Sequence, residues 1–194
     1  MKELLTKEEI IEGLKEIGKK AKANNLVIDI AIYGGAALSI AYNLRNATKD
    51  VDAVVKGDKQ EFKKIVESVA EEKDWSNDWL NDAVKGFLSN EEELRSTNYE
   101  IEGLRIYVPT PEYIFAMKCM AMRSDEYKKS IDMEDIKNLS KIIGIKDKND
   151  AFKIIEKFYP KNRIMPKTLF GIEEIMDNIN KEVEVPKPKK KMKR

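Results

Sequence analysis

Apolar and polar positions alternate with two different periods in the first part of the chain, and these periods predict its first elements. The capping box at 6–9 precedes apolar residues at helical spacing over 10–17, so we expect a helix that ends near Ala23. The stretch 26–33 is mostly β-branched or aliphatic, which is typical of a buried strand. The stretch 36–44 predicts a short helix.

The middle of the chain predicts a second strand and further mixed structure. This strand begins at Asp50, and the turn at 56–58 that follows it introduces a helix with an apolar face over 62–69. The segment 75–87 mixes apolar residues with Asn and Asp, so we expect it to be irregular or partly helical. Residues 98–108 predict one or two strands with a turn at Glu102-Gly103.

The last part of the chain predicts only helices. Thr110 as N-cap and Pro111 in the first turn are a well-formed start signal for a helix that reaches Met122. A following helix begins at Asp132, and two more are expected at about 150–158 and 169–179. The residues predicted to form the buried stripe of the helix that begins at Asp132 are Ile136, Leu139, Ile142 and Ile143.

Together these elements predict an α+β fold in which a small mixed β-sheet is flanked by helices and followed by a helical carboxy-terminal section. We expect a core with an amino-terminal helix over 1–125, the helical section over 126–183, and a disordered basic tail over 184–194. A solubilising role for this tail and a role as a tether for a polyanion such as RNA are about equally favoured.

Composition narrows the chemistry. The 194 residues carry a formal net charge of +1, contain no histidine and contain one cysteine, Cys119. Intramolecular disulfides, histidine-ligated zinc, and serine or cysteine nucleophiles activated by histidine are therefore excluded, which leaves carboxylates, lysines and tyrosines as acids, bases and metal ligands. The sequence shows neither a signal region nor an apolar run of membrane-spanning length, so we expect a cytoplasmic protein without membrane association.

Two carboxylates at the start of the second predicted strand are the most informative feature of the sequence. Residues i and i+2 of a strand project to the same face, so Asp50 and Asp52 can share one metal ion while Val51 points into the core. The spacing therefore predicts a site for a divalent cation.

A glycine pair lies between the first strand and its following helix. Gly34 and Gly35 allow a sharp backbone turn and bring N–H groups at a helix start close to an anion. This pattern predicts that a phosphate group can lie at the turn.

Some of the candidates also have a purely structural explanation. Lys118 is surrounded by uncharged residues in its helix, so its ammonium group extends to solvent, pairs with a carboxylate or points into a cleft. Asp132 and Asp135 lie in a first helical turn, where the helix dipole alone favours carboxylates. Trp75 and Trp79 are suited to stack on a base, although aromatic core packing is the more common role.

The motifs resemble those of the polymerase-beta-like nucleotidyltransferase superfamily. The resemblance lies in the glycine pair with Ala36-Ala37-Leu38, in Arg45 and Thr48, and in Asp50-Val51-Asp52-Ala53-Val54. Further along, the segments 111–118 and 132–136 resemble the lysine and aspartate motifs of the minimal bacterial branch, which includes the AbiEii-type toxins of abortive-infection and toxin–antitoxin systems. The order and spacing of both halves agree over roughly residues 26 to 140.

The resemblance implies a role for each of these residues. Asp50 and Asp52 would bind Mg²⁺ or Mn²⁺, Gly34 and Gly35 would cradle the phosphates of a nucleoside triphosphate, and Lys118 would contact the triphosphate as a point charge. Asp132 would organise Lys118 or the nucleotide pocket. Arg45 would also reach phosphate, with a surface pairing to a nearby acid as an equal alternative.

Two departures from the superfamily pattern are visible. Many members have a serine after the first glycine, where this chain has Gly35, so backbone N–H groups would hold the triphosphate without a hydroxyl. A third carboxylate often comes from a later strand, and its candidates here, Glu100 and Glu102, are not part of a sharp motif.

The expected function is the metal-dependent transfer of a nucleoside monophosphate from a nucleoside triphosphate to an acceptor hydroxyl. RNA, and in particular a transfer RNA 3′ end, is the favoured acceptor, followed by a protein hydroxyl, and toxin activity with an antitoxin partner is one implication of the resemblance. Two alternatives stay open: a catalytically silent module that binds a nucleotide or RNA, and an adenylyltransferase that modifies a small molecule such as an antibiotic.

Overall fold

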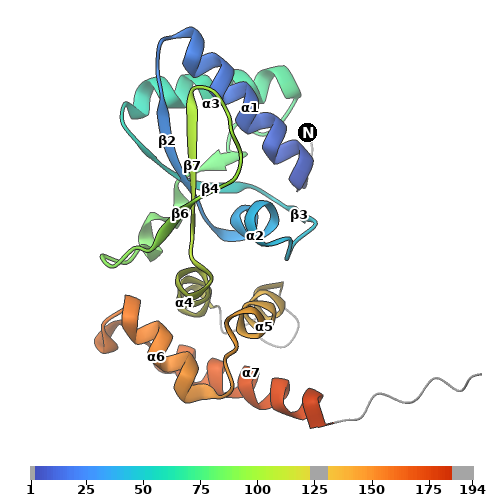
Figure 1. Ribbon diagram of the computed structural model, residues 1–194, viewed down its shortest axis with the longest axis vertical. Helices are drawn as coiled ribbons and strands as arrows, with labels where there is room; N and C mark the ends of the chain where they lie inside the picture. The colour runs from blue at the N-terminus through green and yellow to red at the C-terminus, as the bar shows by residue number, and fades with distance from the viewer. Residues whose placement is uncertain (1–2, 123–130, 185–194) are drawn as a thin grey trace, which may run out of the picture.

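The computed structural model describes residues 3–122 and 131–184, and these form a mixed sheet with helices around it (Figure 1). The strands are β1 (Leu5–Thr6), β2 (Ile28–Ile32), β3 (Ala47–Thr48), β4 (Val51–Lys56), β5 (Leu80–Asn81), β6 (Leu94–Ser96) and β7 (Leu104–Pro109). The α-helices are α1 (Lys7–Ala23), α2 (Gly34–Tyr42), α3 (Lys59–Lys73), α4 (Pro111–Ala121), α5 (Ile131–Ile143), α6 (Lys148–Phe158) and α7 (Pro166–Glu184). Two 3₁₀ helices, η1 (Ala83–Phe87) and η2 (Lys161–Arg163), complete the structure.

The main sheet has the strand order β5-β4-β2-β7-β6, and β1 pairs with β3 in a separate two-stranded sheet. Strand β2 lies in the centre, antiparallel to β4 and parallel to β7. The pair β4–β5 is parallel and the pair β6–β7 is antiparallel. The predicted α+β fold with a small mixed sheet is therefore confirmed.

The helix start signals act as the sequence predicts. Thr6 and Glu9 form a complete capping box, in which each side chain accepts a hydrogen bond from the other residue's backbone N–H. The Thr110 side chain accepts from the N–H of Tyr113, and Pro111 occupies the first turn of α4. These local hydrogen bonds fix where α1 and α4 begin, and thereby where α4 leaves the sheet.

The amino-terminal helices cover the sheet, and the predicted apolar face of α3 is buried. Helices α1 and α3 pack against each other and lie beside the sheet in the upper half of Figure 1. The buried residues of α3 include Phe62, Ile65, Val66 and Val69. Trp79 is 2 % exposed and meets Trp75 edge to face at 4.9 Å between ring centroids, so Trp79 is a core residue.

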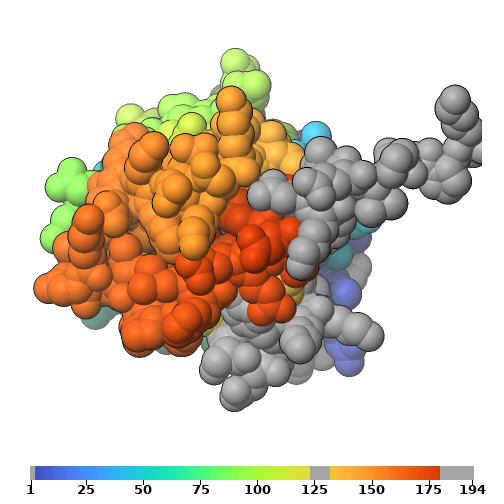
Figure 2. Space-filling model, turned by 90° about the horizontal axis from the view of Figure 1, so that it is seen from below, coloured from blue at the N-terminus to red at the C-terminus, as the bar shows by residue number. Residues whose placement is uncertain are grey.

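Helix α4 connects the sheet to the carboxy-terminal helices. It follows β7 directly and packs against both α5 and α6, while α6 packs against α7 (Figure 1). Seen from below, the coloured surface is formed mainly by α6 and α7 (Figure 2). The expected basic tail lies outside the described residues, apart from Glu184 at the end of α7.

Several boundaries and one core residue differ from the sequence prediction. Helix α2 starts at Gly34 rather than at 36, and β6 comes before the predicted strand region. Ile142 is 50 % exposed and not part of the buried stripe of α5. At about 100° per residue it is turned about 240° from Ile136, whereas Leu139 lies on the same side as Ile136 and both are fully buried.

No helix within the described ranges is both long enough and apolar enough to cross a lipid bilayer.

Candidate functional site

The predicted glycine turn lies at the end of the central strand. Strand β2 ends at Ile32, Tyr33 is the extended N-cap residue of α2, and Gly34 has a φ of +58°. No side chain caps this helix start. The first-turn N–H groups of α2 are therefore oriented as an anion site requires, with the positive end of the helix dipole behind them.

Asp52 packs directly against this turn. The N–H of Tyr33 donates to the Asp52 carbonyl at 2.8 Å, which joins β4 to the end of β2. A β-carbon on Gly34 would lie 2.5 Å from Oδ2 of Asp52. Glycine is therefore required at position 34 for two reasons: its φ is positive, and a side chain would occupy the space of the Asp52 carboxylate.

Asp50 lies one residue before the first residue of β4, on the same side of the site. Its Oδ2 accepts a hydrogen bond at 3.3 Å from the side-chain amide of Asn81 on β5. The Asn81 Oδ1 in turn accepts from the N–H of Ala83, the first residue of η1. Asn81 therefore positions the Asp50 carboxylate, and no motif in the sequence indicated this role.

The two carboxylates repel each other in a partly buried place. Burial raises the pKa of the Asp52 carboxyl above its ordinary value, the Asp50 charge raises it further, and the Lys118 ammonium group opposes both. A bound cation would offset this repulsion.

Lys118 lines the same cavity as the two aspartates. The cavity has a volume of about 320 Å³. Its lining residues are Gly34, Asp50, Asp52, Ala83, Val84, Phe87, Ile114, Met117, Lys118 and Ala121. The lysine is far from the aspartates in the sequence, but β7 runs parallel to β2 and leads directly into α4, which brings the lysine to the end of β2 and the start of β4.

Lys118 is held by two carboxylates of α5. Its Nζ lies 2.7 Å from Oδ1 of Asp132 and 2.9 Å from Oδ2 of Asp135. The side chain of Asp132 is 43 % exposed, whereas that of Asp135 is 3 % exposed. The sequence left three positions open for the Lys118 ammonium group: solvent, a carboxylate partner or a cleft. The structure combines the last two, because Lys118 pairs with carboxylates and lines a cavity.

Arg45 binds the same buried aspartate. Its Nε donates to Oδ1 of Asp135 at 2.9 Å and its Nη2 to Oδ2 at 2.5 Å, a bidentate pair. Nη2 also lies 3.8 Å from Oδ1 of Asp132. Arg45 therefore pairs with a buried acid rather than at the surface, and it does not line the cavity of Asp50 and Asp52.

Gly35 is buried in α2 and packs against the Arg45 region. A β-carbon on Gly35 would lie 2.6 Å from Oγ1 of Thr48 and 2.8 Å from Nη1 of Arg45. The serine that many superfamily members have at this position would not fit here without displacing those groups. Gly35 thus brings α2 close to Thr48 and Arg45.

The carboxylates of Asp50 and Asp52 fit a hard divalent cation whose remaining ligands come from the substrate and from water. Within the described ranges no group of three or more histidine, cysteine, aspartate or glutamate side chains is arranged to hold a metal ion. Mg²⁺ is commonly bound by one or two carboxylates, with substrate phosphates and waters completing its shell. Asp50 and Asp52 are a pair of this kind, and the helix start beside them offers N–H groups to phosphate.

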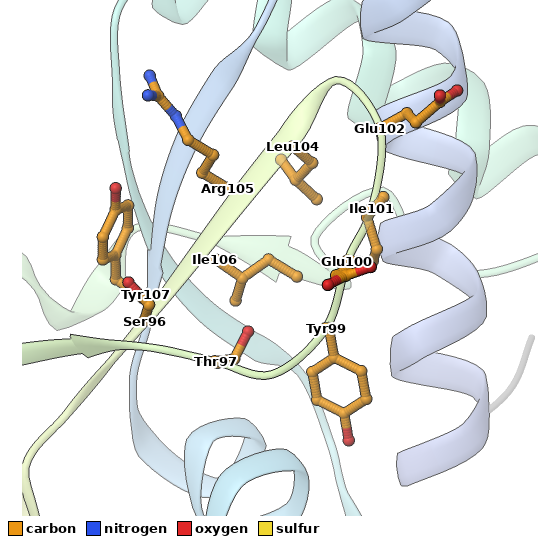
Figure 3. Close-up of a pocket in the computed structure, with 10 residues that line it drawn as sticks. All are labelled: Ser96, Thr97, Tyr99, Glu100, Ile101, Glu102, Leu104, Arg105, Ile106 and Tyr107. Atoms are coloured by element: carbon orange, nitrogen blue, oxygen red, sulfur yellow. The ribbon is translucent and has the colours of Figure 1, made fainter.

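The candidate third carboxylates lie away from the two aspartates, and Glu102 is at the opposite end of the sheet. Ile28, which begins β2, is the partner of Leu104 on β7, and Glu102 just before β7 pairs with Lys22 at the end of α1. Glu100 and Glu102 line a separate cavity of about 520 Å³ that is formed by β7 and the segment connecting it to β6 (Figure 3). The length of β2, about 16 Å, separates Glu102 from Asp52. Glu100 does not line the cavity of the two aspartates, so neither glutamate is placed with them.

Three residues of the site carry no motif that identified their roles. They are Asn81, which binds Asp50, Asp135, which pairs with Arg45 and Lys118, and Phe87, which lines the cavity. The spacing of Asp132 and Asp135 places both on one side of a helix, and this was the one available signal. For Asn81 and Phe87 the signal lies in the tertiary structure alone.

Comparison with known protein families places most of the chain in a family of nucleotidyltransferases. The family described as "Nucleotidyltransferase of unknown function (DUF6036)" matches residues 8–160, which is most of the chain. No curated protein and no solved structure gave a significant match. The matched residues contain the glycine turn, both aspartates, Lys118 and the acidic pair of α5.

Proposed function

The chain belongs to this family of nucleotidyltransferases, and we propose that it transfers a nucleoside monophosphate from a nucleoside triphosphate to an acceptor hydroxyl. The observation that carries the proposal is that Gly34, Asp50, Asp52 and Lys118 line one cavity. They come from three separate parts of the fold, and each has a chemical use in handling a triphosphate.

At the α-phosphorus, the reaction forms one bond and breaks one. The acceptor oxygen attacks the α-phosphorus, the bond from this phosphorus to the bridging oxygen of the β-phosphate breaks, and pyrophosphate leaves while the acceptor proton passes to solvent. A magnesium or manganese ion held by Asp50 and Asp52 would supply Lewis-acid stabilisation of the phosphate charge. The protein's own groups must position the triphosphate and neutralise the remaining charge.

The protein groups divide this work. The N–H groups at the start of α2 would bind the phosphates, and the missing side chain of Gly34 allows the Asp52 carboxylate to lie against the turn. Lys118 contributes a positive charge from α4, and Asp132 and Asp135 hold its ammonium group in place. Asn81 fixes the Asp50 carboxylate.

RNA is the acceptor that we propose, with the 3′ end of transfer RNA first and a protein hydroxyl second. The support is the resemblance to the bacterial toxin branch, which also leads us to propose a cytoplasmic location and a protein antitoxin as partner. The run of basic residues at 187–194 adds an electrostatic attraction for a polyanion.

The test incubates the purified full chain with Mg²⁺, each α-labelled nucleoside triphosphate, and total RNA, transfer RNA or protein acceptors. We expect label on RNA, with release of pyrophosphate. Asp52→Asn and Lys118→Ala should each lower the rate at least about a hundredfold, because charge stabilisation by a metal or fixed cation is worth several kcal/mol. Asp29→Asn is the matched control, since this strand carboxylate lies on β2, pairs with Arg105 and does not line the cavity.

The outcomes separate the proposal from its alternatives. Magnesium-dependent nucleotide binding without pyrophosphate release would indicate a silent binding module. Labelling of a small-molecule acceptor, but not of RNA or protein, would indicate an adenylyltransferase of the antibiotic-modifying kind. Failure to bind any nucleoside triphosphate would contradict every one of these functions except that of a silent module that binds RNA.

A further inference from the structure

The cavity of Asp50 and Asp52 has a second, apolar part that the phosphate chemistry does not use. One face of α4 contributes Ile114, Met117 and Ala121, and η1 contributes Ala83, Val84 and Phe87. Ile114 and Met117 are 1 % and 5 % exposed and form a well-packed surface. A triphosphate needs charged and N–H groups, so this apolar surface requires a different explanation.

Phe87 is the most exposed large apolar side chain of this lining. Its side chain is 42 % exposed, whereas its neighbour Val84 in η1 is 8 % exposed. Single exposed apolar residues are ordinary at protein surfaces, but this one lies at a cavity that also contains two carboxylates and a lysine. An aromatic ring beside a phosphate site is suited to stack on a base.

The backbone of Phe87 is fixed by the carboxy-terminal helices. The Tyr159 hydroxyl donates to the Phe87 carbonyl at 2.5 Å, and the N–H of Ser89 donates to the Tyr113 hydroxyl at 3.0 Å. The Ser89 hydroxyl donates to the Phe158 carbonyl at the end of α6. These contacts hold the segment in place in the absence of a ligand, so binding there requires little ordering.

We infer that Phe87 and the apolar surface of η1 and α4 hold the nucleobase of the nucleoside triphosphate, and that they do so with little preference for one base. This rests on the proposed function and names the part of the substrate that the apolar half of the cavity takes. The side chains of Ala83, Val84, Phe87, Ile114, Met117 and Ala121 offer no hydrogen-bond donor, and the only acceptor among them is the weakly accepting sulfur of Met117. Stacking alone tolerates every base, because each has a π-face.

The test compares magnesium-dependent binding of ATP, GTP, CTP and UTP with that of inorganic tripolyphosphate, which has no base, by calorimetry on the full chain. We expect the four nucleotides to bind the wild type within about tenfold of one another, and tripolyphosphate to bind about 10-fold to 100-fold more weakly. Phe87→Ala should weaken the binding of all four nucleotides by a similar factor and leave tripolyphosphate binding unchanged. Phe87→Trp should keep nucleotide binding.

Two further variants sharpen the experiment. Phe170→Ala is the matched control, because Phe170 is 70 % exposed, lies on α7 and does not line the cavity, so nucleotide binding should be unchanged. Tyr159→Phe removes the hydrogen bond to the Phe87 carbonyl and should weaken nucleotide binding less than Phe87→Ala does. Tripolyphosphate binding reports that each variant is folded around the charged half of the site.

Each contrary outcome has a separate meaning. Equal binding of nucleotides and tripolyphosphate by the wild type, or normal nucleotide binding by Phe87→Ala, would overturn the base site and leave the proposed function standing. A preference above about a hundredfold for one base would overturn the stacking mechanism, since such a preference requires hydrogen bonds to the base. Wild-type protein that binds neither ligand would overturn both proposals.

Discussion

Oδ2 of Asp52 occupies the space beside Gly34, 2.5 Å from the position that a β-carbon on this glycine would take. The glycine turn and the acidic strand are thus two parts of one packed unit, although a helix and a loop separate them in the sequence. A change on either side of this contact must move the other.

Gly34→Ala should therefore damage the site as well as the fold. The left-handed backbone costs about 1–2 kcal/mol for a residue with a side chain, and the new methyl group would also displace the Asp52 carboxylate. We expect a lower free energy of unfolding and loss of magnesium-dependent nucleotide binding, measured by urea denaturation and calorimetry. Gly144→Ala is the control, because Gly144 has a φ of +80° with open space around it, so only stability should fall.

Asp52→Asn should stabilise the metal-free protein at neutral pH. Burial and the neighbouring Asp50 charge raise the pKa of Asp52, so the folded state holds its proton more tightly than the unfolded state, whose carboxyl has the ordinary value of 3.8. The stability of the wild type falls as pH rises from this value through the raised pKa and stays lower above it. The thermal midpoint of Asp52→Asn without metal should exceed that of the wild type at pH 7 and not at pH 3.

The magnesium dependence supplies the complementary measurement. Mg²⁺ with a nucleoside triphosphate should raise the thermal midpoint of the wild type, because a ligand that binds only the folded state stabilises it. Asp52→Asn should show little of this increase. An equal increase in both proteins would contradict the assignment of Asp52 as a metal ligand.

Asp135→Asn should destabilise the protein far more than Asp132→Asn. Asp135 is buried and neutralises both Arg45 and Lys118, so its loss leaves two largely buried cations without this carboxylate, at a cost of about 3 kcal/mol. Asp132 is 43 % exposed, and its substitution should cost at most about 1 kcal/mol. Urea denaturation of the two variants tests this order, and similar losses would contradict it.

Gly35→Ser should lower stability and should not improve activity. The serine side chain would overlap Thr48 and Arg45, and overpacking of this kind costs about 1–3 kcal/mol. Denaturation and transfer assays on one preparation provide the measurement. Higher activity in this variant would show that the site accommodates the superfamily's serine after all.

The buried tyrosines should make the fold sensitive to alkali. Burial raises the pKa of Tyr113 to about 12, and burial also raises the pKa values of Tyr33 and Tyr159. The unfolded chain loses these protons near pH 10, so stability should fall above that pH by about 1.4 kcal/mol per pH unit for each tyrosine, for Tyr113 up to about pH 12. Denaturation at pH 8 and pH 11 should show this loss, and Tyr113→Phe should reduce it.

Short-range pattern was sufficient for part of the site. The position of Asp52 on a strand, one residue from a buried Val51, follows from the two-residue period of β-structure. The starts of α1 and α4 follow from hydrogen bonds within a single turn. Ile142 shows where such patterns fail, since it is apolar and close to helical spacing but lies outside the angular width of the face that α4 and α7 cover.

The sequence by itself determined the two carboxylates, the glycine turn and the helix starts, because each depends on residues a few positions apart and on the period of the backbone. Only the tertiary structure decided that Asp135 pairs with both Arg45 and Lys118, that Asn81 binds Asp50, and that Phe87 lines the cavity of the two aspartates. It also placed Glu100 and Glu102 at a cavity separate from that of the two aspartates. The reason is that the strand order and the direction in which α4 leaves β7 set these distances, and neither leaves a local signal in the chain.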